Sequence, residues 1–232
     1  MIGIVVPAHD EETHIAASVA AIRMAACHPA LNGEAVEVLI VLDSCSDSTG
    51  PIARSLGVRT LAVDARNVGH ARGAGARVLL DEGARWLSFT DADTRVSPDW
   101  LVRQLELDVD AVCGSIGVDD WSVHGDHAES LRAHFARTYT DADDHRHIHG
   151  ANLGVSAAAY VRAGGFPALA CSEDVALVEA LQASGARIAW SAAPRVSTSA
   201  RADARARGGF GDTLLAVIAA GLAAAAVPQL AE

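Results

Sequence analysis

Residues 86–93 read WLSFTDAD, in which four mostly apolar residues lead into two acidic residues separated by one. A short apolar run bounded by polar residues is typical of a buried strand. In extended backbone alternate side chains point to the same side, so we expect the carboxylates of Asp91 and Asp93 to converge. Carboxylate oxygens are the ligands that Mg²⁺ and Mn²⁺ prefer. The stretch predicts a strand that ends in a divalent-cation site, although an isolated pair of aspartates is also common in solvated turns.

Three further apolar runs precede this stretch, and segments with helical spacing separate them. The expected strands cover residues 2–6, 36–42, 58–63 and 86–89, and the expected helices cover residues 12–26, 48–56 and 69–82. This alternation predicts an α/β fold with a mainly parallel central sheet and flanking helices. Ligands of such sheets bind at the carboxyl ends of the strands. Acidic residues follow three of the strands, so we expect one site at that edge.

The second half of the chain is less regular. We expect helices at residues 97–107, 128–138 and 175–183, the last with Ser172 as its N-cap, and a strand at residues 111–118. A short strand and a helix are expected before the GGF sequence of residues 164–166. No linker or internal repeat separates the two halves, so we expect one domain over residues 1–232.

Composition and charge exclude several classes of protein. Half of the residues are hydrophobic and a fifth are charged, which is typical of a globular chain. The net charge is -11 and no basic run occurs, so we expect no nucleic-acid partner. The lack of lysine excludes a P-loop or Schiff-base lysine. The cysteines form no C-x-x-C pair and the chain opens on an apolar run without a basic leader, so we expect a cytoplasmic protein.

An apolar, alanine-rich segment lies near the C-terminus, at residues 214–227. It is shorter than the roughly 20 residues that a membrane-spanning helix needs, so we expect no transmembrane segment. We expect residues 211–232 to form an apolar helix packed on the domain. A peripheral membrane contact and a dimer contact are the alternatives for this helix.

Several short motifs, in their order along the chain, resemble those of family 2 glycosyltransferases, which have the GT-A fold. VVPAHDEE at residues 5–12 resembles the family's opening V-P-x-x-N-E-E, with Asp10 where asparagine is usual. LDSCSDST at residues 42–49 resembles D-x-x-S-x-x-T, residues 67–75 loosely resemble N-x-G-x-x-x-A-R-N-x-G, and residues 91–93 are the D-x-D itself. GAN at residues 150–152, GGF at residues 164–166 and Glu173-Asp174 complete the order, and the resemblance thins after about residue 183.

The resemblance implies transfer of a single sugar from a UDP- or GDP-linked donor to a hydroxyl acceptor, with inversion and with Mn²⁺ or Mg²⁺ as cofactor. It implies a nucleotide-sugar-binding half at about residues 1–110 and an acceptor and catalytic half at about residues 111–210. Asp43 would accept a hydrogen bond from the base, Arg72 would lie near the pyrophosphate, and Asp93 would be the direct metal ligand. The positions implied to bind the nucleotide are Pro7, Ala8, His9, Glu11 or Glu12, Asp43, Arg72, Asp91, which also faces the metal, and Ala92.

The same resemblance implies a base and an acceptor pocket in the second half. Asp174 matches the family's base, which takes the proton of the acceptor hydroxyl, and Glu173 is its catalytic neighbour. Acidic residues in the first turn of a helix are also ordinary capping residues. The positions expected to contact the acceptor are His149, Gly150, Ala151 and Asn152.

Two groups of basic side chains flank these motifs. His145, His147 and His149 alternate, so extended backbone would place them on one side; we expect them to flank the acceptor pocket, with a zinc site as the alternative. The arginines of the later segment predict either a basic loop over the diphosphate or a solvated surface; they are Arg195, Arg201, Arg205 and Arg207.

Other features bear on rival functions. No Q-x-x-R-W motif occurs, so the processive synthases of the family match poorly. The glycines at positions 69, 73 and 75 lie within helix-like sequence rather than directly after a strand, which argues against a dinucleotide-binding fold. The alternatives that remain are a retaining transferase of similar fold, a nucleotidyltransferase, and a non-catalytic nucleotide-sugar binding module.

Overall fold

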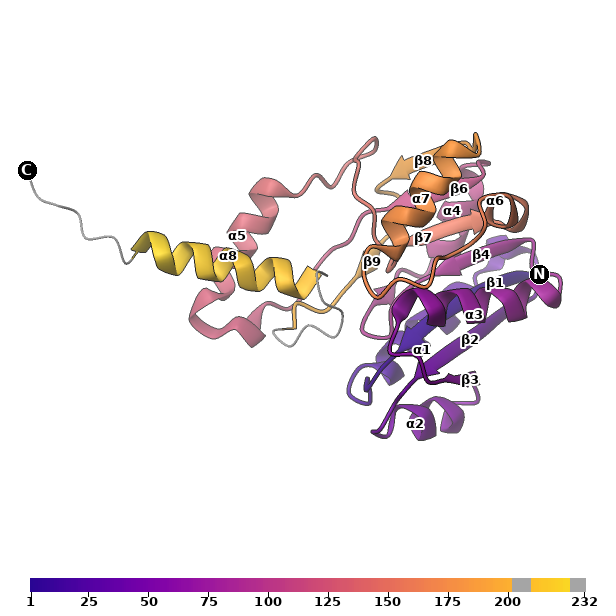
Figure 1. The fold of residues 1–232 in the computed structure, drawn as a ribbon, viewed down its shortest axis with the longest axis horizontal. Coiled ribbons are helices and arrows are strands. Elements are labelled where there is room, and N and C mark those ends of the chain that lie inside the picture. The colour runs from indigo at the N-terminus through magenta and orange to yellow at the C-terminus, as the bar shows by residue number, and fades with distance from the viewer. Residues whose placement is uncertain (202–209, 226–232) are drawn as a thin grey trace, which may run out of the picture.

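The centre of the protein is a seven-stranded sheet with the strand order β3-β2-β1-β4-β7-β6-β8. We analysed a computed structural model, which describes residues 1–201 and 210–225 (Figure 1). The strands are β1 (Ile2–Ala8), β2 (Val36–Asp43), β3 (Arg59–Val63), β4 (Trp86–Phe89), β6 (Ala111–Gly114), β7 (Leu153–Ser156) and β8 (Ile188–Ser191). Only β7 of these seven runs antiparallel to its neighbours. The predicted α/β fold with a mainly parallel sheet is therefore confirmed.

Helices cover both faces of the sheet, because the central strands carry apolar side chains on both faces. In β1, Ile4 and Val6 belong to one hydrophobic core and Val5 to the other, as the two-residue period of a strand requires. One core includes α1 (Ile15–Ala26), α2 (Thr49–Ser55) and α4 (Trp100–Glu106), and a short 3-10 helix, η1 (Pro29–Leu31), lies beside them. The other includes α3 (Val68–Asp81), α6 (Ala157–Arg162) and α7 (Glu173–Ala183).

Helix α3 packs unusually close to the sheet. A Cβ atom on Gly75 would lie 2.6 Å from a methyl carbon of Val5, and one on Gly69 would lie 2.2 Å from the carbonyl oxygen of Pro167. These glycines therefore serve close packing within a helix, and the prediction that they do not form a dinucleotide-binding loop is confirmed.

The carboxyl ends of the first, second and fourth strands meet at one edge. Ala8 pairs with Leu42, Asp43 pairs with Val63, and Val5 pairs with Phe89, so the segments that follow β1, β2 and β4 leave the sheet side by side. The acidic residues after these strands are thus brought to the same edge, as expected.

A two-stranded antiparallel sheet, formed by β5 (Arg95–Val96) and β9 (Val196–Ser197), lies next to this edge. Two-residue strands are too short to show a period, so neither was expected from the sequence. The pairing is reinforced by a hydrogen bond of 2.9 Å between the hydroxyls of Thr94 and Thr198. The β5–β9 pairing brings residues 195–201 back to the end of β4.

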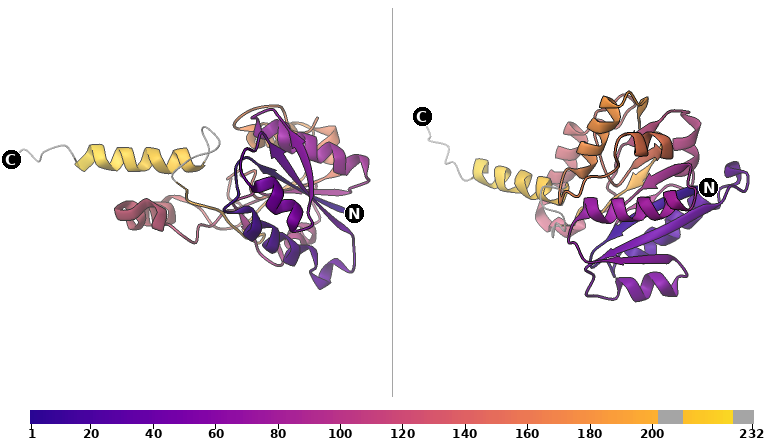
Figure 2. Two further views of the ribbon diagram at one scale, coloured as in Figure 1. Left: turned by 90° about the horizontal axis from the view of Figure 1, so that it is seen from below. Right: turned by 45° about the vertical axis from the view of Figure 1, so that its right-hand side comes forward.

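A helical arm projects from the domain (Figures 1 and 2). The arm contains η2 (Ser122–His127), α5 (Ala128–Thr138) and α8 (Phe210–Ala225). Leu214 of α8 is buried in a small core with Trp121 and Leu131. The C-terminal helix was expected to pack on the domain, but it packs on α5 and not on the central sheet. No helix within residues 1–201 and 210–225 is long and apolar enough to cross a membrane.

Three local predictions differ from the structure. The strand expected at residues 111–118 ends at Gly114, and the helix expected from residue 97 begins at Trp100, after a turn in which Ser97 accepts from Trp100. Ser172 occupies the N-cap position of α7 but has a φ of 59° and makes no side-chain capping hydrogen bond. The helix begins instead with two acidic residues in its first turn, which favour the positive end of the helix dipole.

Candidate active site

We call the carboxyl edge of the sheet that carries Glu11, Asp43, Asp91 and Asp93 the acidic edge. Hydrogen bonds join the loops after β1 and β2 there. The Nδ1 atom of His9 lies 2.7 Å from the carbonyl oxygen of Asp43, and the thiol of Cys45 donates to the carbonyl of Ala8. Asp10 has a φ of 51°, a conformation that aspartate and asparagine tolerate better than most residues. Its carboxylate accepts from the backbone N–H groups of Ser46 and Asp47, and the Ser46 bond in particular lowers the pKa of Asp10. Asp10, at the position where the family usually has asparagine, therefore holds the loop after β2 in place.

The two glutamates of the first motif have different environments. Glu12 is exposed and its carboxylate accepts from the backbone N–H of Ser48, so it belongs to the outer side of the loop. Glu11 is buried, and its carboxylate accepts a hydrogen bond of 2.5 Å from Arg201. The resemblance left the choice between them open; the structure turns Glu11 to the acidic edge.

Asp43 is buried and its carboxylate is surrounded by backbone donors. The N–H groups of Ala65, Arg66 and Asn67 donate to it at 2.8, 2.8 and 2.7 Å. Burial alone would raise the pKa of Asp43, but the bonds from Asn67, Ala65 and Arg66 hold it below its ordinary value. The residue therefore fixes the loop between β3 and α3, and its Oδ2 atom, which accepts only from Asn67 among these donors, keeps room for a further hydrogen bond.

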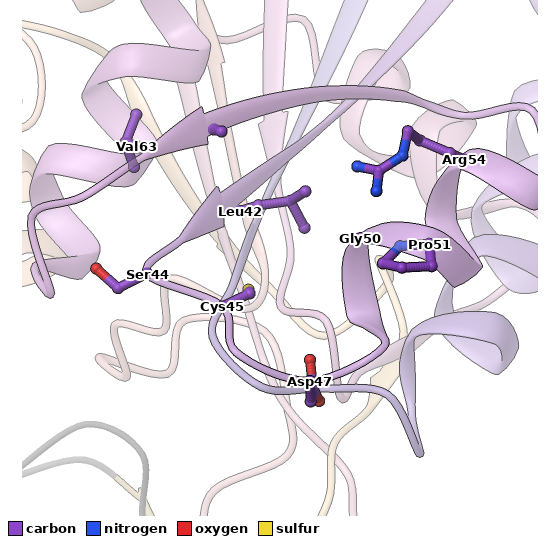
Figure 3. Close-up of a pocket in the computed structure, with 9 residues that line it drawn as sticks. Leu42, Ser44, Cys45, Asp47, Gly50, Pro51, Arg54 and Val63 are labelled. Atoms are coloured by element: carbon purple, nitrogen blue, oxygen red, sulfur yellow. The ribbon is translucent and has the colours of Figure 1, made fainter.

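A cavity of about 230 Å³ opens on the α2 side of β2 (Figure 3). Its lining includes Leu42, Cys45 and Arg54, but none of the residues expected to bind the nucleotide between positions 7 and 12. The ligand atoms of Asp10, Cys45 and Asp47 lie within 4.8 Å of one another beside it. The carboxylates of both aspartates already accept backbone N–H groups, so the fold itself accounts for this cluster.

The D-x-D segment forms a turn and does not continue the strand. The N–H of Thr94 donates to the carbonyl of Asp91, which closes the turn, and Ala92 is 3% exposed in the core. Extended backbone through residue 93 was expected, and that expectation was wrong. The two carboxylates have different partners: Arg72 donates to Asp91 at 2.5 Å and Arg201 lies 2.8 Å from Asp93.

Asp93 carries an unusual charge environment. Burial raises the pKa of Asp93 to about 6; the positive charge of Arg201 opposes this shift, whereas the negative charges of Asp91 and Glu11 add to it. Its side chain is 18% exposed. Burial is the largest cause of the raised pKa and the carboxylates of Asp91 and Glu11 add to it, so a bound cation would stabilise the ionised form of Asp93.

Arg72 links the two halves of the site. It is a buried residue of α3 whose guanidinium binds Asp91 with one nitrogen and Glu173 of α7 with the other. Gly150 lies against this guanidinium, since a Cβ atom there would be 2.4 Å from the Cζ atom of Arg72. Glycine at this position is needed for close approach, and the D-x-D and α7 are held together through one arginine.

The expected catalytic pair is divided between two roles. Glu173 is 4% exposed and its carboxylate binds Arg72, so it is a structural neighbour of the site and is not placed to take a proton. Asp174 is only partly buried, and its oxygens accept the N–H groups of Gly150 and Val175, both at 2.8 Å. These two bonds fix the orientation of the Asp174 carboxylate and leave lone pairs on both oxygens.

His149 lies next to Asp174 and is held as a neutral ring. The Tyr139 hydroxyl accepts the N–H of Ile116 and lies within hydrogen-bond distance of the Nε2 atom of His149, at 3.0 Å. Burial lowers the pKa of His149 to about 4, and the neighbouring His147 lowers it further. His149 therefore offers a neutral hydrogen-bonding group beside the carboxylate.

The other expected histidines form a stack and not a zinc site. The rings of Tyr139 and His147 lie 4.1 Å apart and nearly parallel, and His145 stacks on His147 from 5.4 Å. The zinc alternative has no support in the described part of the chain, where these three rings do not form a group of converging ligand atoms.

Asn152 has a different environment from the one expected. It is fully buried; its Oδ1 atom accepts from Trp100, and its amide nitrogen donates to the carbonyls of Ser115 and Pro194. Both the amide oxygen and the amide nitrogen are engaged within the core, so Asn152 joins three segments there and does not face an acceptor. Ala151 is likewise 8% exposed.

Of the later arginines, the structure describes Arg195 and Arg201, which lie in different places. Arg195 pairs with the exposed Asp141 at 2.5 Å, on the surface, whereas Arg201 reaches the acidic edge. Arg205 and Arg207 lie outside the described residues. No signal in the sequence separates Arg201, which binds Asp93, from Arg195, which does not reach the acidic edge, because the β5–β9 pairing that brings Arg201 there is so short.

Comparisons with known proteins agree with this architecture. The family model described as "Glycosyl transferase family 2" matches residues 3–162. TarS 1–349 from S. aureus, in complex with UDP-GlcNAc, has a TM-score of 0.64 and 14% identity over 98% of this chain and 68% of that chain. A longer TarS chain gives a TM-score of 0.62 and 15% identity over 85% of this chain and 36% of that one.

A third structure has a similar fold. The mannosyltransferase PcManGT from Pyrobaculum calidifontis, in complex with GDP-Man and Mn²⁺, has a TM-score of 0.56 and 19% identity over 83% of this chain and 57% of that chain. The chain thus spans little more than half of that protein. A comparison with curated proteins gives no match. The family model covers most of the residues that form the sheet and the acidic edge, and the chain belongs to glycosyl transferase family 2.

Proposed function

We propose that this chain transfers a single sugar from a nucleoside-diphosphate sugar to a hydroxyl group, with inversion at the anomeric carbon. The observation that carries the proposal is the link through Arg72, which holds Asp91 of the acidic edge and Glu173, the neighbour of Asp174, on one guanidinium. A donor bound at the edge and an acceptor bound at α7 would then meet. Family membership supports the reaction class, although the matched residues end before Asp174.

The acidic edge fits a divalent cation. Asp93 and Glu11 each place a carboxylate oxygen within hydrogen-bond distance of one nitrogen of Arg201, so a positive charge already lies between them. Carboxylate oxygens suit Mg²⁺ and Mn²⁺, and we propose Asp93 and Asp91 as the residues that would hold the ion. The ion would supply charge neutralisation for the departing diphosphate.

Asp174 is proposed as the base. As the acceptor oxygen forms its bond to the anomeric carbon, the bond from that carbon to the phosphate oxygen breaks and its electron pair leaves with the nucleoside diphosphate. The hydroxyl proton goes to the carboxylate of Asp174, which two backbone N–H groups hold in position. Neutral His149 beside it can accept a hydrogen bond or donate one without adding a charge.

The nucleotide is proposed to bind against the loops after β1 and β2. Pro7, Ala8 and His9 are joined there to the segment of Asp43, whose Oδ2 atom can accept from a base N–H. Both uracil and guanine present such a donor, so UDP- and GDP-linked sugars are equally suitable partners. The acceptor would contact His149 and the backbone of residues 150–151.

A transfer assay tests this function. The chain is incubated with a panel of UDP- and GDP-linked sugars and hydroxyl acceptors, with Mn²⁺, with Mg²⁺ or with EDTA, and the anomeric configuration of the product is determined by NMR. We expect metal-dependent release of UDP or GDP, an inverted product, and a rate that falls roughly 10² to 10⁴-fold with Asp174→Asn. An Asp174→Asn rate within a few-fold of wild type would refute the inverting mechanism.

A binding experiment separates the enzyme from a simple binder. Ligands that bind the native state raise the unfolding temperature, so UDP and GDP should raise it more with Mn²⁺ than with EDTA. Binding without slow hydrolysis of any donor indicates a non-catalytic module, and no metal-dependent shift with any nucleotide contradicts the proposed function as a whole.

A further inference from the structure

A guanidinium occupies the place between the carboxylates of the acidic edge. The Nη2 atom of Arg201 lies 2.5 Å from Oε2 of Glu11 and 2.8 Å from Oδ2 of Asp93. All three side chains are largely buried, with exposed fractions of 11% for Arg201, 8% for Glu11 and 18% for Asp93. Ion pairs removed from water in this way are screened little by salt and are costly to break on one side only.

The backbone around Arg201 is anchored on both the small sheet and the arm. Val196 and Ser197 pair with β5, and the side chain of Thr198 bonds to Thr94 in the segment that follows the D-x-D. Ala200 is 2% exposed in the core of the arm, and its carbonyl lies 2.5 Å from the Nε2 atom of His124. The fold therefore delivers Arg201 to Asp93 through several contacts that the arginine itself does not make.

The guanidinium contacts one of the two carboxylate oxygens that Asp93 offers to a divalent cation, and the other, Oδ1, lies 3.3 Å from the hydroxyl of Thr94. A cation bound by Asp93 needs direct contact with a carboxylate oxygen, at a distance of about 2.0 to 2.1 Å for Mg²⁺. The guanidinium already contacts Oδ2 of Asp93 and carries a positive charge of its own. Two cations cannot share this position without strong repulsion.

We propose that Arg201 is an internal counter-cation of Asp93 and Glu11, and that a divalent ion binds the acidic edge only when the guanidinium leaves these carboxylates. The inference rests on the proposed function in that it takes the D-x-D as a cation site. It adds a regulatory property: the metal competes with a side chain of the same protein. Without donor, metal affinity is reduced by the fraction of molecules in which Arg201 holds the site.

The competition also links metal and donor. A guanidinium released from Asp93 can bind the anionic oxygens of a diphosphate, which are strong acceptors for arginine. A donor that engages Arg201 would remove the competitor of the metal, and by linkage the metal would strengthen donor binding by the same factor. The acidic edge would thus stay neutralised while it is empty and would take up both ligands together.

The test measures Mn²⁺ binding to the full chain without any donor, from the loss of the free Mn²⁺ signal in electron paramagnetic resonance. Arg201→Gln removes the competing charge and should raise Mn²⁺ affinity about tenfold or more. The matched control is Arg195→Gln, since Arg195 lies in the same segment but pairs with the exposed Asp141, and its Mn²⁺ affinity should equal that of wild type. Asp93→Asn combined with Arg201→Gln should abolish the gain, which assigns the added binding to this site.

A second variant covers the case in which Arg201→Gln does not fold. Arg201→Lys replaces the planar fork with a single ammonium group, which bridges two carboxylates less well, and should also raise Mn²⁺ affinity. Wild-type affinity in the folded variants overturns the inference. If the wild type binds Mn²⁺ with UDP or GDP present but the variants show no gain without nucleotide, only this inference fails. If no form binds Mn²⁺ under either condition, the proposed metal-dependent function fails with it.

Discussion

The end of β2 and the turn after β4 each place an aspartate with little solvent exposure at the carboxyl edge of the sheet, but the two aspartates are neutralised in opposite ways. Asp43 is surrounded by three backbone N–H groups, and its pKa is lowered. Asp93 has an arginine from a segment more than a hundred residues away, and burial raises its pKa to about 6. Backbone donors cannot leave without unfolding the loop, whereas a side chain can. The difference is the one expected if Asp43 fixes its loop and if Asp93, as proposed, receives a ligand.

The largest effect that this comparison predicts is on catalysis. Asp93→Asn removes a charge from the proposed metal position, and we expect transfer to fall roughly 10² to 10³-fold, as for the loss of other electrostatic stabilisers. Stability should change less than with Asp43→Asn, because Arg201 keeps Glu11 as a partner. The rate of sugar transfer and a thermal melt of the same sample measure both quantities.

The control for this variant is Asp119→Asn, which affects an exposed pair with Arg95 and should leave the rate unchanged. Transfer at the wild-type rate by Asp93→Asn would show that the turn after β4 is no more functional than the loop after β2, and the comparison would fail.

The next largest effect is a loss of stability when Arg72, the ion-pair partner of Asp91, is displaced. Gly150→Ala places a methyl group against the guanidinium of Arg72, which has to move away from Asp91 or Glu173. Breaking a buried ion pair of this kind costs about 3 kcal/mol, and we expect a loss of that size in the free energy of unfolding. Urea denaturation measures it.

A matched glycine gives the control. Gly73→Ala in α3 adds a methyl group at ordinary contact distance, 3.5 Å from the carbonyl oxygen of Phe166, and alanine favours the helix. Stability should stay the same or increase. Equal stability of Gly150→Ala and wild type would mean that Arg72 is free to move like Arg201, and its role as a fixed link would be wrong.

A smaller effect is expected where the backbone provides the donors. Asn in place of Asp43 keeps one oxygen acceptor and turns an amide toward N–H groups that need an acceptor, so at least one buried donor loses its bond. We expect Asp43→Asn to lower the free energy of unfolding by about 2 kcal/mol. Asp64→Asn is the matched control, because Asp64 is exposed and its carboxylate accepts from the side-chain hydroxyl of Ser44. Equal effects of the two substitutions would contradict the structural role of Asp43.

How much of this could be predicted depended on how far apart in sequence the partners lie. The strands, the acidic residues at their ends and the helix that contains Gly75 all follow from local period and composition, and the structure has them nearly as expected. The seven-strand order follows less directly, because the reversal of β7 leaves no mark in a four-residue strand.

The site was predicted in outline and missed in its contacts. Arg72 with Gly150 and Glu173, and Arg201 with Glu11, are pairs separated by 78 to 190 residues, and no periodicity relates such positions. Asn152 was assigned to the acceptor as part of the GAN motif at residues 150–152, yet its side chain lies in the core, where it bonds to Trp100, Ser115 and Pro194. Motif order thus indicates where a site lies, and only packing decides which members of a motif face the ligand.

The smallest predicted effect is on the pH dependence of the free energy of unfolding, to which Asp93 and Asp43 contribute with opposite signs. A carboxyl whose folded-state pKa is raised binds its proton more tightly in the folded protein, so folding is favoured as the pH falls through the folded value. For Asp93, with a pKa of about 6 against an ordinary value of 3.8, this gain develops as the pH falls from about 7 toward 4. Asp43, whose pKa is lowered, contributes stability above its ordinary pKa and loses it only in more acidic solution.

Between pH 7 and pH 5 in EDTA, the wild type should therefore gain about 1 kcal/mol of unfolding free energy relative to Asp93→Asn. The histidines and the other carboxyls titrate in both proteins, so their contributions cancel in the difference. Urea denaturation at the two pH values provides the four numbers needed. The same subtraction for Asp43→Asn should give no gain in this range, because the Asp43 carboxyl stays ionised throughout. If the wild type gains stability relative to Asp43→Asn, or gains none relative to Asp93→Asn, the two carboxylates are neutralised in the same way. Arg201 would then be as permanent a partner of Asp93 as the backbone is of Asp43.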